Sequence, residues 1–330
     1  MVSQDIELTP HRGATVYVVL LNWNNASDTI ACLKSLEKLA HTDFRVIVAD
    51  NASRDDSYTQ IANYIREASS AAGTGFVELQ ADDACSYVLH QSVKHVLLQT
   101  GSNLGFAGGN NMAVRLAMIQ EDMRYIWLLN NDTEVDPLSL QELVLAYERF
   151  PETGICGSKL VYFDDRSKLQ ALGGRYNRWL ATSSHVHGHD DPSGTYDEIK
   201  ISASIDYVVG ASMLVSRSFL ERVGLMSEDY FLYYEEIDWA TRARRAGYKL
   251  HIAISSIVFH KEGASINAGS TRRSEISERC YLKNRLVITR KFFPLYLPIV
   301  WATGLLIALR RILRRDIRGF KIALSVLFEA

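Results

Sequence analysis

Two short polar clusters in this sequence contain the residue types used in metal-assisted acid–base chemistry. The first is Asn130-Asn131-Asp132, which directly follows the apolar run Tyr125–Leu129. Alternate residues at the end of a strand point to the same side, so Asp132 could ligate a divalent cation and Asn130 could add a neutral oxygen. Asn and Asp are also frequent in turns, and the triplet alone leaves both interpretations open.

The second cluster, Glu235, Glu236 and Asp238, opens a predicted helix after an aromatic run. Acids in a first helical turn complement the helix dipole, which is one explanation for them. Desolvation between the aromatic run and the apolar helix would instead raise a carboxylate pKa toward the range of a general base. Further along, His260 ends the predicted strand Lys249–Phe259, and a lone histidine there is more often a surface residue than a metal ligand.

A glycine-rich loop, Gly101–Asn111, precedes another predicted helix. Its spacing matches neither GxGxxG nor GxxxxGK[ST], which argues against a dinucleotide fingerprint and a Walker-type nucleotide site. Glycines before a helix N-terminus still allow a phosphate-bearing ligand to approach the backbone closely. Loops of this kind are also often only structural.

The elements that must position these residues alternate between strand and helix with short loops, which predicts a mostly parallel α/β sheet flanked by helices. The predicted strands of the first half are Val16–Leu21, Phe44–Ala49, His95–Gln99 and Tyr125–Leu129. Ligands of such sheets lie beyond the carboxyl ends of the strands. The residues at those ends are Asn22, Asn24, Asp50, Asn51, the glycine-rich loop, Asn130 and Asp132. They are therefore expected to meet in one crevice.

Seven segments form an ordered set: Val-Val-Leu-Leu-Asn22-Trp-Asn24, Val-Ala-Asp50-Asn-Ala-Ser53, Asn103-Leu-Gly-Phe-Ala-Gly-Gly-Asn-Asn111, Leu-Leu-Asn130-Asn-Asp132-Thr, Gly210-Ala-Ser-Met-Leu, Tyr-Tyr-Glu235-Glu236-Ile-Asp238-Trp and Arg-Ala-Gly247-Tyr. In this order they resemble the inverting family 2 glycosyltransferases, which have a GT-A fold. Within that family they resemble the bacterial rhamnosyltransferase-like and galactofuranosyltransferase-like enzymes that build cell-surface glycans. The resemblance extends over about residues 14–265.

The resemblance implies a nucleotide-sugar site in the first half of the chain. Asp50 matches the acid that contacts the base or ribose, and the loop Asn22–Asn24 borders that pocket. The other residues expected at the nucleotide sugar are Asn51, Gly105, Asn110 and Asn130.

The resemblance also implies a divalent cation, Mg²⁺ or Mn²⁺. Asn130 and Asp132 match the DxD metal motif with Asn in place of its first Asp, so Asp132 is the expected main ligand. His260 matches a metal-binding histidine found in part of the family. The cation would neutralise the departing nucleotide diphosphate.

Glu236 matches the catalytic base of the family, which is usually Asp. The longer side chain leaves the assignment open to Asp238. In the implied reaction the base removes the proton of an acceptor hydroxyl, whose oxygen displaces the nucleotide diphosphate and inverts the anomeric carbon. The QxxRW motif of processive synthases is missing, because Tyr176-Asn-Arg178-Trp179 lacks the Gln. We therefore expect transfer of one or a few sugars.

The favoured donor is dTDP-rhamnose, and the expected acceptor is a glycan or a polyprenyl-diphosphate-linked glycan. The alternatives are a transferase that uses UDP-galactofuranose or a UDP-hexose, and a catalytically degenerate membrane protein that binds a sugar nucleotide or glycan. A nucleotidyltransferase usually needs a basic glycine-rich loop near its N-terminus, and residues 22–27 contain no Lys or Arg.

The composition, with 47% hydrophobic and 22% charged residues, excludes a disordered chain. The net charge of −2 conceals an asymmetry, because residues 279–330 contain eleven Lys and Arg against two acids. This basic tail points to one local anionic partner and away from a nucleic-acid binder. The four cysteines are widely spaced, which favours reduced, buried thiols in a cytosol-facing protein.

The apolar run Phe292–Leu309 has 18 uncharged residues, near the ~20 that span a bilayer. Pro294 and Pro298 are expected to break it, and basic residues flank both of its ends. These features favour a segment that lies in the membrane interface at the cytoplasmic face of a bacterial inner membrane. A helix packed on the catalytic domain, or a homo-oligomer contact, is the alternative.

The expected organisation has three parts. A polar segment, residues 1–13, has no apolar signal region. The GT-A domain spans 14–265, with a nucleotide-binding half at 14–136 and an acceptor half at 137–265. A helical, basic tail follows at 266–330.

Overall fold

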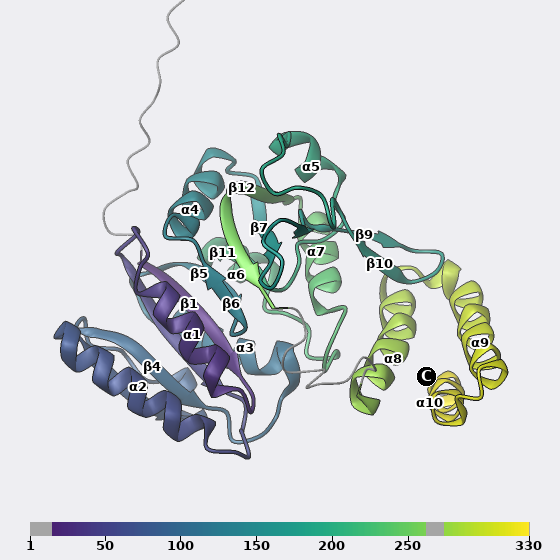
Figure 1. Cartoon of the computed structure of the whole chain (residues 1–330), viewed down its shortest axis with the longest axis horizontal. Coiled ribbons are helices and arrows are strands. Elements are labelled where there is room, and N and C mark those ends of the chain that lie inside the picture. The colour runs from purple at the N-terminus through teal and green to yellow at the C-terminus, as the bar shows by residue number, and fades with distance from the viewer. Residues whose placement is uncertain (1–14, 262–273, 330) are drawn as a thin grey trace, which may run out of the picture.

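The computed structural model describes residues 15–261 and 274–329. A central mixed sheet is flanked by helices on both faces, and three C-terminal helices project from one side of this body (Figure 1). The expected segment 1–13 lies outside the described residues, as does the junction between the GT-A domain and the tail.

The main sheet has ten strands, with the order β3-β4-β2-β1-β5-β11-β7-β12-β6 and β8 paired to β7. The strands are β1 (Thr15–Asn22), β2 (Phe44–Asp50), β3 (Gly75–Gln80), β4 (Val93–Gln99), β5 (Met123–Asn130), β6 (Thr133–Val135), β7 (Thr153–Tyr162), β8 (Leu169–Ala171), β11 (Ser212–Ser216) and β12 (Lys249–His260). From β3 to β5 all pairings are parallel, while β11 runs antiparallel to both of its neighbours. This is the mostly parallel α/β sheet expected from the alternating pattern.

Side chains alternate between the two faces of the sheet, and each face has its own core. Val16, Val18 and Leu20 of β1 point into one core, whereas Tyr17 and Val19 point into the other. The first core is covered by α1 (Ala26–Leu36), α2 (Ser57–Ala72) and α4 (Ser139–Arg149), and the second by α3 (Gly105–Met118), α6 (Arg217–Val223) and α7 (Glu235–Arg245). Burial on both faces explains why these strands read as continuous apolar runs.

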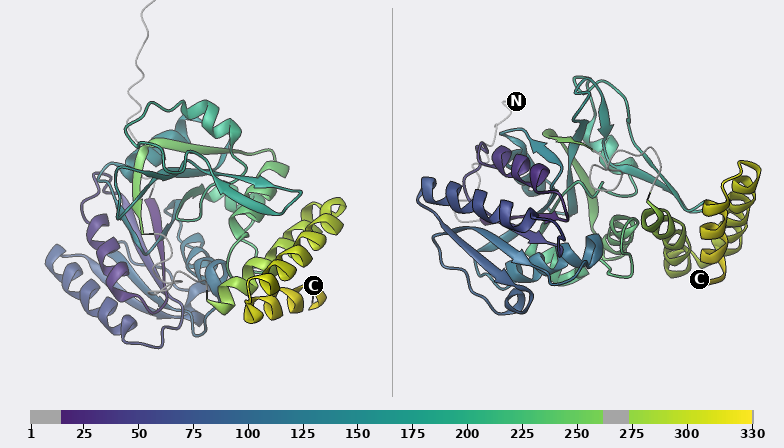
Figure 2. Two further views of the ribbon diagram at one scale, coloured as in Figure 1. Left: turned by 45° about the vertical axis from the view of Figure 1, so that its right-hand side comes forward. Right: turned by 60° about the horizontal axis from the view of Figure 1, so that its bottom comes forward.

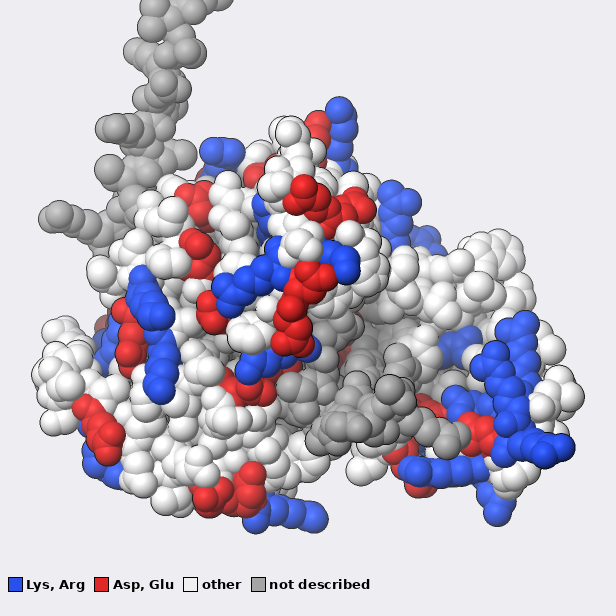
Figure 3. Space-filling view, in the orientation of Figure 1, with Lys and Arg blue, Asp and Glu red and all other residues white. Residues whose placement is uncertain are grey.

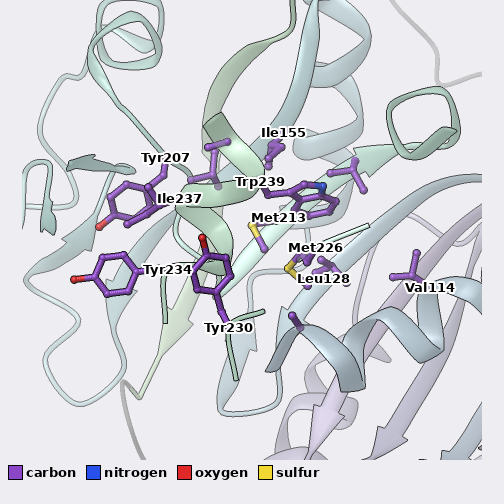
Figure 4. Close-up of a cluster of buried hydrophobic side chains, with 14 of the residues drawn as sticks. Val114, Leu128, Ile155, Tyr207, Met213, Met226, Tyr230, Tyr234, Ile237 and Trp239 are labelled. Carbon is purple, nitrogen blue, oxygen red and sulfur yellow. The ribbon is translucent and has the colours of Figure 1, made fainter. Parts of the chain in front are cut away.

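The second core is rich in aromatic side chains around α7. Trp239 packs edge-on against Phe219 with ring centroids 5.3 Å apart, and the Trp239 indole nitrogen donates to the Gly224 carbonyl. Tyr207 and Tyr234 lie on the side of α7 away from Trp239 (Figure 4), and the Tyr230 hydroxyl donates to Asp238 of the helix. The helix that carries the acidic cluster is therefore fixed by large rings on both sides.

The region 69–92, which no sequence pattern resolved, contains the end of α2, the edge strand β3 and a 3₁₀ helix, Ala81–Cys85. The thiol of Cys85 is exposed and that of Cys280 is only partly buried, so the expectation of buried cysteines is correct for Cys32 and Cys156 alone. The apolar sequence of residues 207–215 predicts one continuous strand, but β11 begins only at Ser212, and Tyr207 makes an isolated bridge to Gly174.

A two-stranded hairpin of β9 (Gly174–Asn177) and β10 (Thr182–His185) extends from the body toward the C-terminal helices (Figure 2). Those helices are α8 (Glu275–Phe292), α9 (Leu297–Leu313) and α10 (Ile317–Glu329), and a short 3₁₀ turn, Pro294–Tyr296, connects α8 to α9. A further helix, α5 (Glu198–Ser204), packs on β12.

The apolar run Phe292–Leu309 is interrupted at Pro294, as expected, because α8 ends at Phe292, but Pro298 does not break it. Pro298 lies in the first turn of α9, where its missing N–H leaves no hydrogen bond unmade, and Pro294 lies in the preceding 3₁₀ turn. The segment Pro294–Leu313 is therefore 20 residues of near-continuous helix, long and apolar enough by length and composition to cross a bilayer. Only its face around Val300, Gly304 and Ala308 is buried against the other helices.

Candidate active site

The carboxyl ends of β1, β2 and β5 lie side by side, as the parallel pairing requires. Asn22 is paired with Asp50 across β1 and β2, and Leu21 is paired with Asn130 across β1 and β5. The structure thus brings these predicted site residues to one edge of the sheet.

At the β1–β2 end the side chains are joined by hydrogen bonds. The Asn22 amide donates to Asp50 at 3.3 Å and to the Ser53 hydroxyl at 3.1 Å, and Asp50 also accepts from the Ser53 backbone at 3.0 Å. Asn22 and Asp50 have no exposed surface, whereas Asn24 is exposed and adopts a left-handed conformation. Of the residues in this loop that were predicted to bind the nucleotide sugar, Asn24 is therefore the one that a ligand can reach directly. Asn22 and Asp50 hold the loop in place behind it.

Asn51 connects the glycine-rich loop to β2. Its amide donates to Asn103 at 3.0 Å and to the Gly105 carbonyl at 3.2 Å, while its oxygen accepts from the Leu104 backbone at 3.0 Å. Asn51 is 3% exposed, so these contacts give it a structural role. A contact from the Asn51 side chain to a nucleotide sugar, which the sequence predicted, would have to replace one of them.

The glycines of this loop have packing reasons of their own. Gly105 has φ of +72°, and a Cβ at this position would lie 2.3 Å from the Phe231 carbonyl oxygen. A Cβ at Gly109 would lie 2.4 Å from a methyl group of Leu21. Asn110, which was also predicted to bind the nucleotide sugar, is buried, and its side chain donates a hydrogen bond to the Phe106 carbonyl. The loop is thus built to pack α3 closely on β1 and on the loop before α7.

Asp132 and His260, expected as metal ligands, are in contact. His260 Nε2 lies 3.1 Å from Asp132 Oδ1 and 3.3 Å from the amide nitrogen of Asn130. The contact forms because the end of β12 pairs with β6, which begins directly after Asp132. Asp132 is 4% exposed and His260 is 7% exposed, so both groups are largely removed from water.

Gln170 orients the imidazole of His260. Its side-chain oxygen lies 2.9 Å from His260 Nδ1, which fixes the ring with Nε2 directed toward Asp132 and Asn130. Gln170 is buried on β8, and nothing in the sequence identified it, because β8 is three residues long and its partner is distant in the chain.

These residues fit a divalent cation. Burial alone would raise the pKa of Asp132, but the neighbouring His260 more than offsets it, and the net effect holds the Asp132 pKa below its ordinary value. Asp132 Oδ1 is buried and receives no hydrogen bond of acceptable geometry from the described residues. A buried, ionised carboxylate beside an imidazole nitrogen is a combination of ligand types that suits Mg²⁺ or Mn²⁺. Within the described residues no group of three or more His, Cys, Asp or Glu could hold a metal, so further ligands would come from Asn130 and the substrate.

The three acids at the start of α7 lie in different surroundings. Asp238 has no exposed side-chain surface and is held by Arg242 at 2.6 Å, Lys291 at 2.9 Å and the Tyr230 hydroxyl at 3.2 Å. Its carboxylate oxygens are therefore occupied by two cations and a hydroxyl, and Asp238 anchors the helix within the core.

Glu236 has the environment of a base. It is partly exposed, and desolvation raises its pKa to about 7, although the backbone N–H groups at the start of α7 work against the shift. Its neighbour Glu235 is 4% exposed, and burial together with the Glu236 charge raises its pKa well above the ordinary value. A carboxylate that titrates near neutral pH can accept and release a proton during turnover.

The backbone before Glu235 is strained. Tyr233 and Tyr234 have φ of +71° and +77°, a conformation that costs bulky residues about 1–3 kcal/mol each. Asn284 of α8 donates to the carbonyls of Leu232 and Tyr233 at 2.8 and 2.9 Å. Asn284 and Lys291 thus support the acidic helix from the tail, a role that sequence inspection missed because both lie in an apparently ordinary amphipathic helix.

Comparison with known proteins identifies several relatives at 25–26% identity. The low-salt glycan biosynthesis hexosyltransferase Agl10 of Haloferax volcanii is 26% identical over 221 residues, which cover 62% of this chain and 62% of that protein. The N-acetylglucosaminyl-diphospho-decaprenol L-rhamnosyltransferase of Mycobacterium tuberculosis is 25% identical over 50% of this chain and 58% of its own length. The rhamnosyltransferase WbbL of Escherichia coli is 25% identical over 77% of this chain and 93% of its own length. The chain thus spans about three-fifths of the first two relatives.

Two solved structures share the fold. GalNAc-T7, determined with UDP, GalNAc and Mn²⁺, superposes with a TM-score of 0.59 at 14% identity. The superposed region covers 86% of this chain and 49% of the GalNAc-T7 chain. The mannosyltransferase PcManGT of Pyrobaculum calidifontis, in complex with GDP-Man and Mn²⁺, superposes with a TM-score of 0.53 at 15% identity over 96% of this chain and 74% of its own. These likenesses confirm the GT-A fold expected from the ordered motifs. Residues 80–224, somewhat less than half of the chain, match the family model described as Glycosyl transferase family 2.

Proposed function

We propose that this protein is an inverting, metal-assisted glycosyltransferase that moves a sugar from a nucleotide-sugar donor, with dTDP-rhamnose favoured, to a glycan or lipid-linked glycan. The observation that carries the proposal is the buried Asp132–His260 contact at the carboxyl edge of the sheet, with its undonated carboxylate oxygen. The family match and the rhamnosyltransferase relatives support both the reaction class and the donor.

In this proposal Glu236 is the general base. Its carboxylate removes the proton of the acceptor hydroxyl while that oxygen bonds to the anomeric carbon from the face opposite the leaving group. The bond between the anomeric carbon and the nucleotide diphosphate breaks in the same step, which inverts the centre. A pKa of about 7 allows Glu236 to be ionised before the step and to release the proton to water after it.

Asp132, His260 and Asn130 would hold the cation, with Gln170 fixing the imidazole. A bound Mg²⁺ or Mn²⁺ would supply positive charge to the leaving diphosphate. Asn24 would border the nucleotide, and the hydrogen-bonded Asn22–Asp50–Ser53 network would hold its loop in place.

We further propose that the acceptor is carried by a polyprenyl diphosphate and that the protein works at the cytoplasmic membrane surface in cell-envelope polysaccharide synthesis. One relative is named for a decaprenol-linked acceptor, which supports the first part. The outward face of α9 exposes leucines and isoleucines, and Lys and Arg gather over the same helices (Figure 3). Because the opposite face of α9 packs on α10 and α8, an interfacial position fits better than a span.

A donor screen tests the proposal. Purified protein would be incubated with dTDP-rhamnose, UDP-galactofuranose or UDP-hexoses, with Mn²⁺ or EDTA, and the release of nucleotide diphosphate measured. We expect metal-dependent release from dTDP-rhamnose. Release only from UDP-galactofuranose or a UDP-hexose would change the donor. Binding of a donor without release from any of them would favour a degenerate binding protein.

A further inference from the structure

A groove of about 650 Å³ lies outside the sheet edge, between the β9–β10 hairpin and the start of the C-terminal apolar segment. The hairpin reaches toward the beginning of α9 (Figure 2). The groove is lined by Arg175, Tyr176, Asn177, Arg178, Trp179, Thr182, Ser183, Ser184, Asp206 and Tyr296. None of these residues belongs to the donor site or the metal pair.

The groove carries excess positive charge. Arg175 and Arg178 are both exposed, and neither forms an ion pair with an acid in the part of the chain that the structure describes. The acid of the groove, Asp206, is already paired with Arg244 and also accepts from the Tyr176 backbone. Two arginines with hydroxyl and amide side chains between them suit an anion with several oxygens, such as a diphosphate.

One wall of the groove is aromatic. Trp179 is 57% exposed, and its ring meets that of Tyr296 edge-on with centroids 4.7 Å apart. The Arg178 guanidinium lies 5.2 Å from the centre of the Phe293 ring, which holds its charge at the groove. An exposed indole beside fixed cations offers a stacking surface for a sugar next to the anion.

At one end the groove approaches the proposed base. The Tyr234 hydroxyl, two residues before Glu236, donates to the Ala181 carbonyl of the hairpin at 2.8 Å. Tyr207, whose backbone bridges to Gly174 at the base of the hairpin, lies beside Ile237, the residue after Glu236 (Figure 4).

At the other end the groove opens onto apolar surface. Leu295, next to Tyr296, is 89% exposed and is the second residue of the segment Pro294–Leu313. A ligand that fills the groove would therefore have a proton-accepting carboxylate beyond one end and an apolar helix beyond the other.

We infer that this groove binds the diphosphate ester that joins the sugar to the lipid in the acceptor, with Arg175 and Arg178 on the phosphate oxygens and Trp179 on the sugar. The inference rests on the proposed function, and it names the part of the acceptor that the protein holds. A diphosphate could also come from the nucleotide donor, so the experiment must separate these two sources.

Binding is measured in full-length protein with farnesyl diphosphate as the lipid probe and dTDP or UDP as the nucleotide probe, by titration calorimetry in a mild detergent. We expect the double variant Arg175→Ala/Arg178→Ala to lose at least tenfold in affinity for farnesyl diphosphate and less than twofold for either nucleotide. Farnesol, which lacks the phosphates, should not discriminate between wild type and variant. The matched control is Arg124→Ala/Arg149→Ala, two exposed arginines that also lie over aromatic rings but away from the groove.

Tryptophan fluorescence provides a second measurement. Farnesyl diphosphate should change the emission of the wild type and not that of Trp179→Phe, which preserves an aromatic wall. Unchanged affinity for farnesyl diphosphate in the double arginine variant would overturn the inference. An equal loss for nucleotides would overturn it too, because the groove would then serve the donor. Failure of every donor in the nucleotide-release screen, with farnesyl diphosphate binding intact, would reject the transferase proposal and leave the diphosphate site standing.

Discussion

The Lys291 ammonium lies 2.9 Å from the buried carboxylate of Asp238. Lys291 belongs to α8, at the start of the tail, whereas Asp238 belongs to α7, which carries Glu236. Although burial works against its charge, the pKa of Lys291 is held above the ordinary value by Asp238 and Asp229. The tail is therefore connected through ionic contacts to the helix that presents the proposed base.

Replacing Lys291 by Ala should destabilise the protein. Asp238 would keep Arg242 as a partner, so we expect a loss of about 1–3 kcal/mol in the free energy of unfolding, below the ~3–5 kcal/mol for a fully unpaired buried charge. Denaturant-induced unfolding of the variant and the wild type measures this loss. Lys249→Ala removes an exposed pair with Glu152 and should change stability by less than about 1 kcal/mol. Equal effects in the two variants would show that the Lys291 contact is as weak as a surface pair.

Glu236→Gln should reduce kcat by roughly 10²–10⁴-fold with little change in donor binding, because it removes basicity and preserves shape. In the wild type, kcat should rise with pH and level off above about 7, as Glu236 ionises. Asp238→Asn is the comparison, since it should lower stability as well as activity. If Asp238→Asn alone gave the selective loss of kcat with normal stability, the base would be Asp238.

Ionisation of Glu236 should lower the stability of the folded protein, although it raises kcat. The folded-state pKa of about 7 exceeds the unfolded value near 4.5, so the folded protein retains a proton in that range that the unfolded chain releases. Stability should therefore fall as pH rises from 4.5 to 7. Glu236→Gln cannot ionise and therefore avoids this loss. The difference in Tm between the variant and the wild type should favour the variant more at pH 8 than at pH 4.5. The corresponding change in the free energy of unfolding is roughly 1–3 kcal/mol. Glu121→Gln, a change at the exposed surface, should show no such difference.

Asp132→Asn should abolish metal-dependent nucleotide binding and transfer, since it removes the charge beside His260. His260→Ala and Gln170→Ala should weaken the metal response in that order, because Gln170 acts only by orienting the imidazole. Titration of dTDP with and without Mn²⁺ measures the response. His251→Ala removes a buried histidine that pairs with Glu198, and should cost stability while the Mn²⁺ effect persists. A full Mn²⁺ effect in Asp132→Asn would contradict the metal site.

Membrane binding should depend on the exposed face of α9. The variant Leu306→Gln/Leu309→Gln/Leu313→Gln changes residues that are 48–83% exposed, so the fold should persist while sedimentation with anionic vesicles falls severalfold. Leu138→Gln, equally exposed on the catalytic body, should sediment like the wild type. High salt or carbonate should release the wild type. Release only by detergent would point to a spanning helix.

The parallel half of the fold was predictable from sequence because its strands are buried on both faces and read as apolar runs. The polar residues at their ends followed from that topology. The positions of Asp50 and Asp132 at this edge of the sheet were predictable in this way. The burial of Asn51 and Asn110 was not predictable, because it depends on how closely α3 packs against the sheet. Gln170, Asn284 and Lys291 act on residues far away in the chain, and no local pattern marks such contacts.

Asp132 comes from the half of the chain expected to bind the donor, and His260 from the half expected to bind the acceptor. Their contact is one of those that join the two halves, which also pair through β5 and β11. A gene fusion that exchanged one half for that of a relative would need to preserve this contact for the proposed metal site to survive. Donor and acceptor preferences could then diverge separately in evolution, and chimeric proteins joined between β6 and α4 offer a direct way to recombine them.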